Sequence, residues 1–235
     1  MKRLAALAWI LPCLWLAGIA LAAAQSAPRP FQGSIQYEIL NQSRSLPRQQ
    51  MAVMPVSASV KMSETQFAFN QGDGNKTIAD ARTGELHSLV NLSMMGLGKY
   101  HIATNAADRL ADTLAFKSGN LVATGQSRDI AGYQAQEYVA ALGSEQGNIE
   151  IHIWCVPGFC SPVFHWATQV AIAPLPGFPL EYSFKTDAYT MTVSVKKLRY
   201  GKVSASAFKI PKGYQTASEQ EMQRDIENVM KLIGQ

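Results

Sequence analysis

Apolar and polar residues alternate along five long segments of this chain. In the first, Phe31 to Ile39, every second residue is apolar or glycine, and the residues between them are polar. The same period of two returns in four more segments: Met54 to Met62, Ile149 to Ile153, Phe178 to Phe184, and Tyr189 to Val195. Because successive side chains of a strand point to opposite faces of a sheet, each segment predicts a half-buried strand.

Six shorter strands are predicted between these segments. Turn residues such as Gly72-Asp73-Gly74-Asn75 and Arg82-Thr83-Gly84 separate some of them, and a spacing of roughly ten residues is typical of an antiparallel meander. The predicted ranges are Gln66 to Asn70, Lys76 to Asp80, Glu85 to Val90, Lys99 to Thr104, Asn120 to Ser127, and Gln134 to Ala141.

Three segments show helical spacing instead. Ala106 to Lys117 and a segment opened by Ser161-Pro162 predict short helices. The strongest pattern is at the end of the chain, where Ser218 and Glu221 have the spacing of a capping box. Apolar residues fall on one side of the helix that would follow: Met222, Ile226, Val229, Met230 and Ile233.

These elements predict a mainly β protein of the α+β class. A large antiparallel sheet with one apolar face and few helices must close into a barrel or curl around those helices. We expect an open, strongly curved sheet, a half-barrel with helices on its concave side. A closed eight-stranded barrel is the alternative.

The first 24 residues predict export. Lys2 and Arg3 precede an uncharged, mostly apolar run, which ends in Ala22-Ala23-Ala24, the pattern of a secretory signal peptide. We expect cleavage after Ala24, which leaves 25–235 as a single domain in the periplasm. An uncleaved membrane anchor is the alternative, since about 20 apolar residues can span a bilayer.

The charge argues against nucleic acid as a partner. Cleavage would remove Lys2 and Arg3 but no acidic residue, so the net charge of +4 would fall to +2. Binding through phosphates needs a concentrated basic surface, and the main basic cluster here is Lys196-Lys197 with Arg199, which suits a solvated strand end.

Two cysteines remain after the signal, Cys155 and Cys160. In an oxidising compartment they are expected to form a disulfide, because Pro157-Gly158 between them suits a type II turn. The alternative is a redox dithiol, but those motifs have two intervening residues rather than four.

Several short motifs, in order, carry a family likeness. They are Thr124-Gly125-Gln126, Asp129 to Tyr133, Ile153-Trp154, Pro176 to Glu181, Phe208 to Tyr214, and the turn Ile78 to Glu85. The chain resembles an exported bacterial family of unknown function whose members are similar to the lipoprotein-carrier superfamily, the LolA and LolB type of half-barrel. The resemblance covers most of 31–214 and implies that fold.

The chain departs from the family pattern between Cys155 and Pro176. This segment contains the apolar run Val163-Phe164-His165-Trp166. The resemblance implies that helices and loops cover the open side of the half-barrel, so Phe164 and Trp166 are candidates for a lid over an apolar cavity. A helix packed on the sheet is the alternative.

Catalytic and metal-binding patterns are absent from the sequence. The four histidines, His87, His101, His152 and His165, do not have the spacing of a metal site on one element, and each can be a solvated side chain. His152 and Cys155 are three apart, so on a strand they would lie on opposite faces and could not form a catalytic pair. We therefore predict no metal, no cofactor and no enzymatic activity.

A methionine-bearing segment is the best candidate for ligand contact. In Leu92 to Gly98, Met94, Met95 and Leu97 lie between glycines and polar residues. Methionine adapts to varied apolar shapes, so these residues could line a ligand mouth, or they could fill the core beside a turn.

Three functions are compatible with the sequence. The first is a periplasmic binding or carrier protein for a lipid or an acylated protein. The second is an envelope protein-interaction or assembly module whose core is filled by its own side chains. The third, an enzyme, would need polar groups converging in a cavity.

Overall fold

One large sheet dominates the fold. The structure is a computed structural model, which describes residues 31–43, 45, 47, 51–52, 54–72, 74–105, 121–144, 147–159, 175–186 and 189–233, without the side chains of 141–149. The strands are β1 (Gly33–Ser43), β2 (Ser57–Met62), β3 (Gln66–Gln71), β4 (Asn75–Asp80), β5 (Glu85–Asn91), β6 (Lys99–Thr104), β7 (Leu121–Ile130), β8 (Tyr133–Ser144), β9 (Gly147–Pro157), β10 (Gly177–Lys185), β11 (Tyr189–Tyr200) and β12 (Gln215–Thr216).

The helical elements are short, apart from the last. They are the 3₁₀ helices η1 (Ser93–Met95) and η2 (Ala205–Phe208) and the α-helix α4 (Glu219–Ile233). The helices predicted within 106–117 and after Ser161 lie outside the described residues. In the described part of the chain, no helix is both long enough and apolar enough to cross a bilayer.

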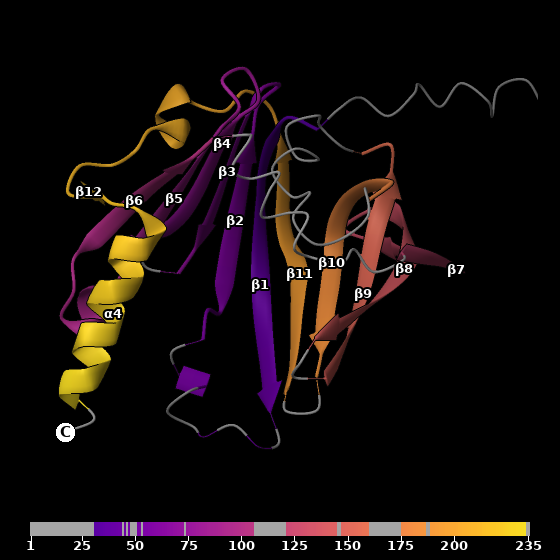
Figure 1. The fold of residues 1–235 in the computed structure, drawn as a ribbon. Helices are drawn as coiled ribbons and strands as arrows, with labels where there is room; N and C mark the ends of the chain where they lie inside the picture. Colours follow the sequence, from indigo (N-terminus) through magenta and orange to yellow (C-terminus); the bar gives the residue numbers. More distant parts are fainter. Residues whose placement is uncertain are drawn as a thin grey trace, which may run out of the picture.

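The 12 strands follow the order β12-β6-β5-β4-β3-β2-β1-β11-β10-β9-β8-β7. Two antiparallel meanders, β1 to β6 and β7 to β11, meet where β1 pairs with β11, and only β12 is parallel to its neighbour (Figure 1). Because β12 and β7 end the sheet, it is open, and the closed barrel is wrong.

All eleven predicted strands are present, the five from alternation and the six from turn residues and spacing. In β1, for example, Ile35, Tyr37 and Ile39 are buried and the residues between them are half-buried or exposed. In the turn between β7 and β8, Ala131 and Gly132 have φ values of 55° and 82°, which suit a two-residue hairpin loop. The prediction missed β12.

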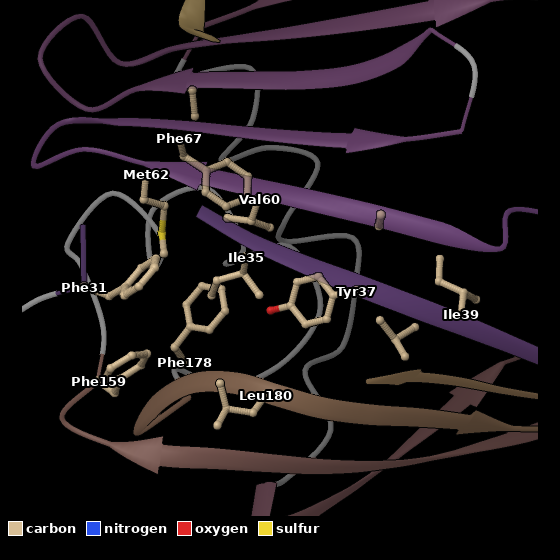
Figure 2. Packing of buried hydrophobic residues seen from close by; sticks show 13 residues of the cluster. Phe31, Ile35, Tyr37, Ile39, Val60, Met62, Phe67, Phe159, Phe178 and Leu180 are labelled. Atoms are coloured by element: carbon tan, nitrogen blue, oxygen red, sulfur yellow. The ribbon is translucent and has the colours of Figure 1, made fainter. Parts of the chain in front are cut away.

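The main core lies on one face of the sheet, where β1 to β3 and β9 to β11 meet (Figure 2). Phe31 contacts Phe159 and Phe178, with ring centroids 5.3 and 6.1 Å apart. The Tyr37 hydroxyl on β1 donates a hydrogen bond to the Pro179 carbonyl on β10, at 2.8 Å, although β11 lies between these strands. A side chain could not bridge two strand spacings on a flat sheet, so the sheet bends here. Bulges at Gln36/Tyr37 in β1 and Pro179/Glu181 in β10 favour that bend.

The opposite face is apolar only over one half of the sheet. We expected it to be solvated, but Ala68, Ile78 and Leu89 pack there against Phe208 and Tyr214. The segment after β11 therefore covers β3 to β5 on the face opposite the main core. The Tyr214 hydroxyl donates to the Gly74 carbonyl, and the Lys76 ammonium donates to the Ala207 carbonyl at 2.7 Å. Burial, followed by the charge of Lys61, lowers the pKa of Lys76.

The last helix has the predicted start but not the predicted place. Ser218 Oγ accepts from the Glu221 backbone N–H at 3.1 Å, and Glu221 Oε2 accepts from the Ser218 N–H at 2.7 Å, which is a complete capping box. We expected helices to fill the concave side, but α4 lies at the β6 edge of the sheet (Figure 1), where the Tyr100 hydroxyl donates to Asp225 at 2.9 Å.

The turn after β9 is also as predicted. The Phe159 N–H donates to the Val156 carbonyl at 3.0 Å, and Gly158 has a φ of 73°, so Pro157-Gly158 occupy the centre of a tight turn. Cys155 is buried on the core face. Cys160 lies outside the described residues, so the Cys155–Cys160 disulfide stays a prediction.

Candidate functional site

The bent sheet carries an apolar face that continues past its central core. Ile151, Ile153 and Cys155 on β9 extend the core cluster toward the β7 end of the sheet. Half-buried apolar side chains pack against them: Leu121, Tyr138, Leu175, Tyr182 and Phe184. The face is therefore largely aliphatic and aromatic along β1 to β3 and β8 to β11, which suits contact with an apolar ligand.

The tyrosines on this face are neutral phenols. Burial raises the pKa of Tyr182 to about 12 and raises the pKa of Tyr37 well above its ordinary value, since desolvation disfavours the phenolate. A ligand on this face would therefore meet uncharged surface with a few hydroxyl groups. Tyr182 and Phe184 are in edge-to-face contact, with ring centroids 5.5 Å apart.

The predicted ligand-contact residues are only partly described. Met94, Met95 and Leu97 lie in the loop between β5 and β6, where η1 forms. The Met94 side chain is 92% exposed, whereas Met95 and Leu97 are half-buried. Phe164 and Trp166 lie outside the described residues, so a meeting of the two segments stays a prediction.

An open groove separates α4 from strand β6. It has a volume of about 1030 Å³ and is lined by Ile102, Ala103, Thr104, Ser218, Glu219, Gln220, Gln223, Arg224 and Glu227. These residues mix both signs of charge with amides. The groove is therefore more suited to polar contacts than to an acyl chain.

A carboxylate–imidazole–carboxylate array lies on the opposite face, across β8 and β9. His152 Nδ1 is 3.0 Å from Glu137 Oε1, and His152 Nε2 is 2.6 Å from Glu150 Oε1. The Thr124 hydroxyl donates to Glu137 Oε2 at 2.8 Å. Glu137 is buried beneath these partners.

This array favours the charged form of His152. Hydrogen bonds to Glu137 and then Glu150 raise the pKa of His152. Burial raises the pKa of Glu137, but the hydrogen bonds from His152 and Thr124 outweigh it, so the net shift is downward. Both ring nitrogens of His152 are engaged by carboxylates, so the array balances charge across two strands rather than offering a free base.

Arg128 and Glu181 extend the polar surface beside the array. Arg128 Nη2 pairs with Glu181 Oε1, and its guanidinium lies 4.0 Å from the centroid of the Trp154 ring. The Ser194 hydroxyl donates to Glu181 at 3.1 Å. Charged groups thus cover the outer face of β7 to β11, opposite the apolar face.

A second histidine cluster lies across the β5–β6 hairpin. His87 Nδ1 and His101 Nε2 are 3.1 Å apart. The sequence placed these residues on separate strands, 14 positions apart, and we interpreted each as solvated. The register places His101 opposite Leu89, so it is a diagonal neighbour of His87. The spacing of two histidines across a predicted hairpin was the signal that could have revealed the pair.

His152 and Cys155 lie on opposite faces, as the spacing predicted. Cys155 packs in the core with Ile151 and Ile153, while His152 is half-exposed on the polar face. In the part of the chain that the structure describes, no group of three or more His, Cys, Asp or Glu side chains has the arrangement of a metal site.

Comparisons with known proteins give only distant similarity. No protein-family model matches the chain, and no curated protein matches its sequence. Among solved structures, the chain is similar to PNGF-II in the C2 space group, with a TM-score of 0.48 and 11% identity over 83% of this chain and 33% of that one. For PNGF-II in the P21 space group the TM-score is 0.47 and the identity 10%, over 84% and 34%.

A further similarity is to LprF from Mycobacterium bovis, with a TM-score of 0.31 and 11% identity over 78% of this chain and 91% of that one. This chain spans about a third of the length of PNGF-II. Similarities at these TM-scores assign no function, so any functional proposal depends on the residues themselves.

Proposed function

We propose that this protein is an exported, non-enzymatic binding or carrier protein for an apolar ligand, a lipid or an acylated protein, held against the concave face of a half-barrel. The supporting observation is the apolar face that runs from the core at β1 to the half-buried rings of Tyr138, Tyr182 and Phe184. Export to the periplasm rests on the pattern of residues 1–24.

Apolar contact alone would give useful affinity only for a deeply buried acyl chain. An acyl chain of ~14 carbons gains roughly 11 kcal/mol at ~0.8 kcal/mol per buried CH₂. Association costs about 4–15 kcal/mol, so deep burial of the chain on a preformed face is needed for net binding. The small net charge of the protein is compatible with recognition that does not depend on ion pairs.

The direct test is native mass spectrometry with lipid extraction on protein purified from the periplasm without detergent. We expect a lipid or fatty acid at near one-to-one stoichiometry. A clean mass of the protein alone, together with no binding of a fluorescent fatty acid, would contradict the proposal.

Substitutions at two adjacent residues of β11 test the two faces of the sheet separately. Met191 pairs with Phe184 on the apolar face, whereas Thr192 pairs with Ser183 on the polar face. We predict that Met191→Lys weakens fluorescent fatty-acid binding at least tenfold, because it places a charge beside the acyl chain. Thr192→Lys, the matched control, should leave binding within about twofold. Equal affinities for the two folded variants would argue against a ligand on this face.

A protein-interaction module is the second candidate. It is favoured by α4, on which Met230 and Leu232 are 57% and 76% exposed, and by the complete burial of Phe31, Ile35 and Phe178 in the core. If no lipid binds, this function becomes the better explanation.

A further inference from the structure

The two facing nitrogens of His87 and His101 define a separate feature on the outer face of the β5–β6 hairpin. They lie 3.1 Å apart, and their ring centroids are 5.2 Å apart with planes inclined at 49°. The rings do not stack face to face. Each instead directs one nitrogen toward the other.

The groups around the pair favour lone pairs on both facing nitrogens. Glu85 Oε2 lies 3.7 Å from His87 Nε2, and a carboxylate attracts the ring proton to that nitrogen. On the other side, the Thr216 hydroxyl lies 3.4 Å from His101 Nδ1, where its oxygen can accept the second ring proton. With protons at these outer positions, His87 Nδ1 and His101 Nε2 face each other as two acceptors. Two acceptors at this distance repel unless a cation lies between them.

The separation of the nitrogens suits a metal ion. Imidazole nitrogens bind late first-row metals at about 2.0–2.1 Å, so two of them on one ion lie roughly 2.9–3.4 Å apart for angles between 90° and tetrahedral. The observed 3.1 Å lies within this range. Rotating each ring by a modest angle would direct both lone pairs to a common point.

We propose that His87 and His101 form a binding site for one late first-row divalent metal ion, with Cu²⁺ bound more tightly than Zn²⁺. The order follows the general affinity of nitrogen ligands for these ions. Glu85 and Thr216 would hold the ring orientations from outside, the role that carboxylate and hydroxyl partners play behind metal-bound histidines. Water would complete the coordination, since among the described residues no group of three or more His, Cys, Asp or Glu side chains is arranged to hold a metal, and Glu85 lies at the outer nitrogen of His87.

The pair can be reached from solvent and lies beside strand β12. The His87 side chain is partly exposed, so an ion can reach the pair from solvent. Thr216 belongs to β12, so an ion here would also strengthen the attachment of that strand to β6.

The test is titration of tag-free protein, previously treated with EDTA, with Cu²⁺ alone in a non-chelating buffer. Isothermal titration calorimetry should give one Cu²⁺ per chain, and the electron paramagnetic resonance spectrum should show hyperfine coupling to two nitrogens. Zn²⁺ should bind at the same stoichiometry but more weakly. We expect His101→Gln and His87→Gln each to weaken Cu²⁺ binding at least about tenfold.

His152→Gln is the matched control, because it removes a half-exposed histidine from the same sheet without touching the pair. It should leave Cu²⁺ affinity within about twofold. Equal Cu²⁺ affinity in the wild type and His101→Gln, or loss of binding only in His152→Gln, would overturn the proposal. The absence of one-to-one binding in wild-type protein would also overturn it, provided that the circular dichroism spectrum shows the protein to be folded. In that case the two rings would share a proton.

Discussion

The Asp80 carboxylate contacts the turn that follows it, a side chain of the neighbouring strand β3, and the charged side chain of Arg82. It accepts a hydrogen bond from the Arg82 backbone N–H at 2.9 Å and pairs with the Arg82 guanidinium, and Gln66 donates to it at 2.9 Å. The hydrogen bond from the Arg82 side chain is the largest cause that lowers the pKa of Asp80 to about 2. Asp80 therefore has two roles, one in the turn and one in an ion pair.

This lowered pKa predicts a loss of stability in acid. Because the folded-state pKa lies below the unfolded one, the contribution is present at neutral pH and is lost as pH falls from about 4 toward 2. We predict that Asp80→Asn lowers the free energy of unfolding at pH 7 by about 1–2 kcal/mol, with a smaller difference from the wild type near pH 2.5. Urea unfolding at both pH values measures this.

Asp129→Asn is the control, because the Asp129 carboxylate accepts a comparable turn hydrogen bond from the Gly132 N–H at 3.0 Å. Asparagine can keep that bond, so little change is expected. A constant effect of Asp80→Asn at both pH values would rule out the electrostatic explanation.

His152 predicts the opposite dependence on pH. Its pKa is raised by Glu137 and Glu150, so its contribution is complete below the unfolded-state pKa and is lost as pH rises through the folded-state pKa. We predict that wild type exceeds His152→Gln in free energy of unfolding by less than ~1 kcal/mol at pH 6, because the side chain is partly solvated, and that this excess shrinks by pH 9.

His101→Gln, measured in EDTA, provides a contrast to this result. The pKa of His101 is lowered, so its titration destabilises the fold as pH falls rather than as it rises. If the effect of His152→Gln grew instead between pH 6 and pH 9, the array would not hold a charged imidazole.

At the scale of elements, the β7–β8 hairpin contains a residue in a strained conformation. Ala131 has a φ of 55°, in the left-handed region, where a side chain other than glycine costs about 1–2 kcal/mol. We predict that Ala131→Gly raises the free energy of unfolding by about 0.5 kcal/mol, since relief of strain exceeds the added entropy of the unfolded chain. Thermal unfolding should show a melting temperature higher by roughly 1–2 °C.

Ala103→Gly is the matched control for this substitution. Ala103 is exposed in β6, an extended strand, so glycine there relieves no strain and should lower stability by about 0.5–1 kcal/mol. If both variants were destabilised equally, the turn would not carry the strain.

Local pattern was sufficient to predict most of these elements. Alternation identified five of the strands from β1 to β11, turn residues and spacing identified the other six, and the pair Ser218 and Glu221 identified the start of α4. All of these signals depend only on residues that are near one another in the sequence. Strand β12 has two residues and no alternation, so no period exists to reveal it. It forms only because the covering segment brings Gln215 beside Tyr100.

At the scale of the whole molecule, the features that the sequence did not predict depend on contacts between residues that are distant in the chain. Periodicity indicates which side chains share a face, but it does not indicate that β1 pairs with β11 and thereby joins the two meanders. Both histidine clusters depend on register: Glu137 meets His152, and His87 meets His101, only through specific strand pairings. Sequence reasoning therefore predicted the strands β1 to β11 and the start of α4, and missed β12 and the polar clusters.

The bulge in β7 has a consequence for how the protein behaves at high concentration. Pairing between β7 and β8 is interrupted between Ala123 and Ser127, where Gly125 has a φ of 78°. An interrupted, twisted edge gives the strand of a neighbouring molecule few consecutive positions for hydrogen bonds. At the opposite end, β6 carries only the two-residue β12. Neither end of the sheet therefore offers a long regular edge on which strands of other molecules could pair and extend into a fibre.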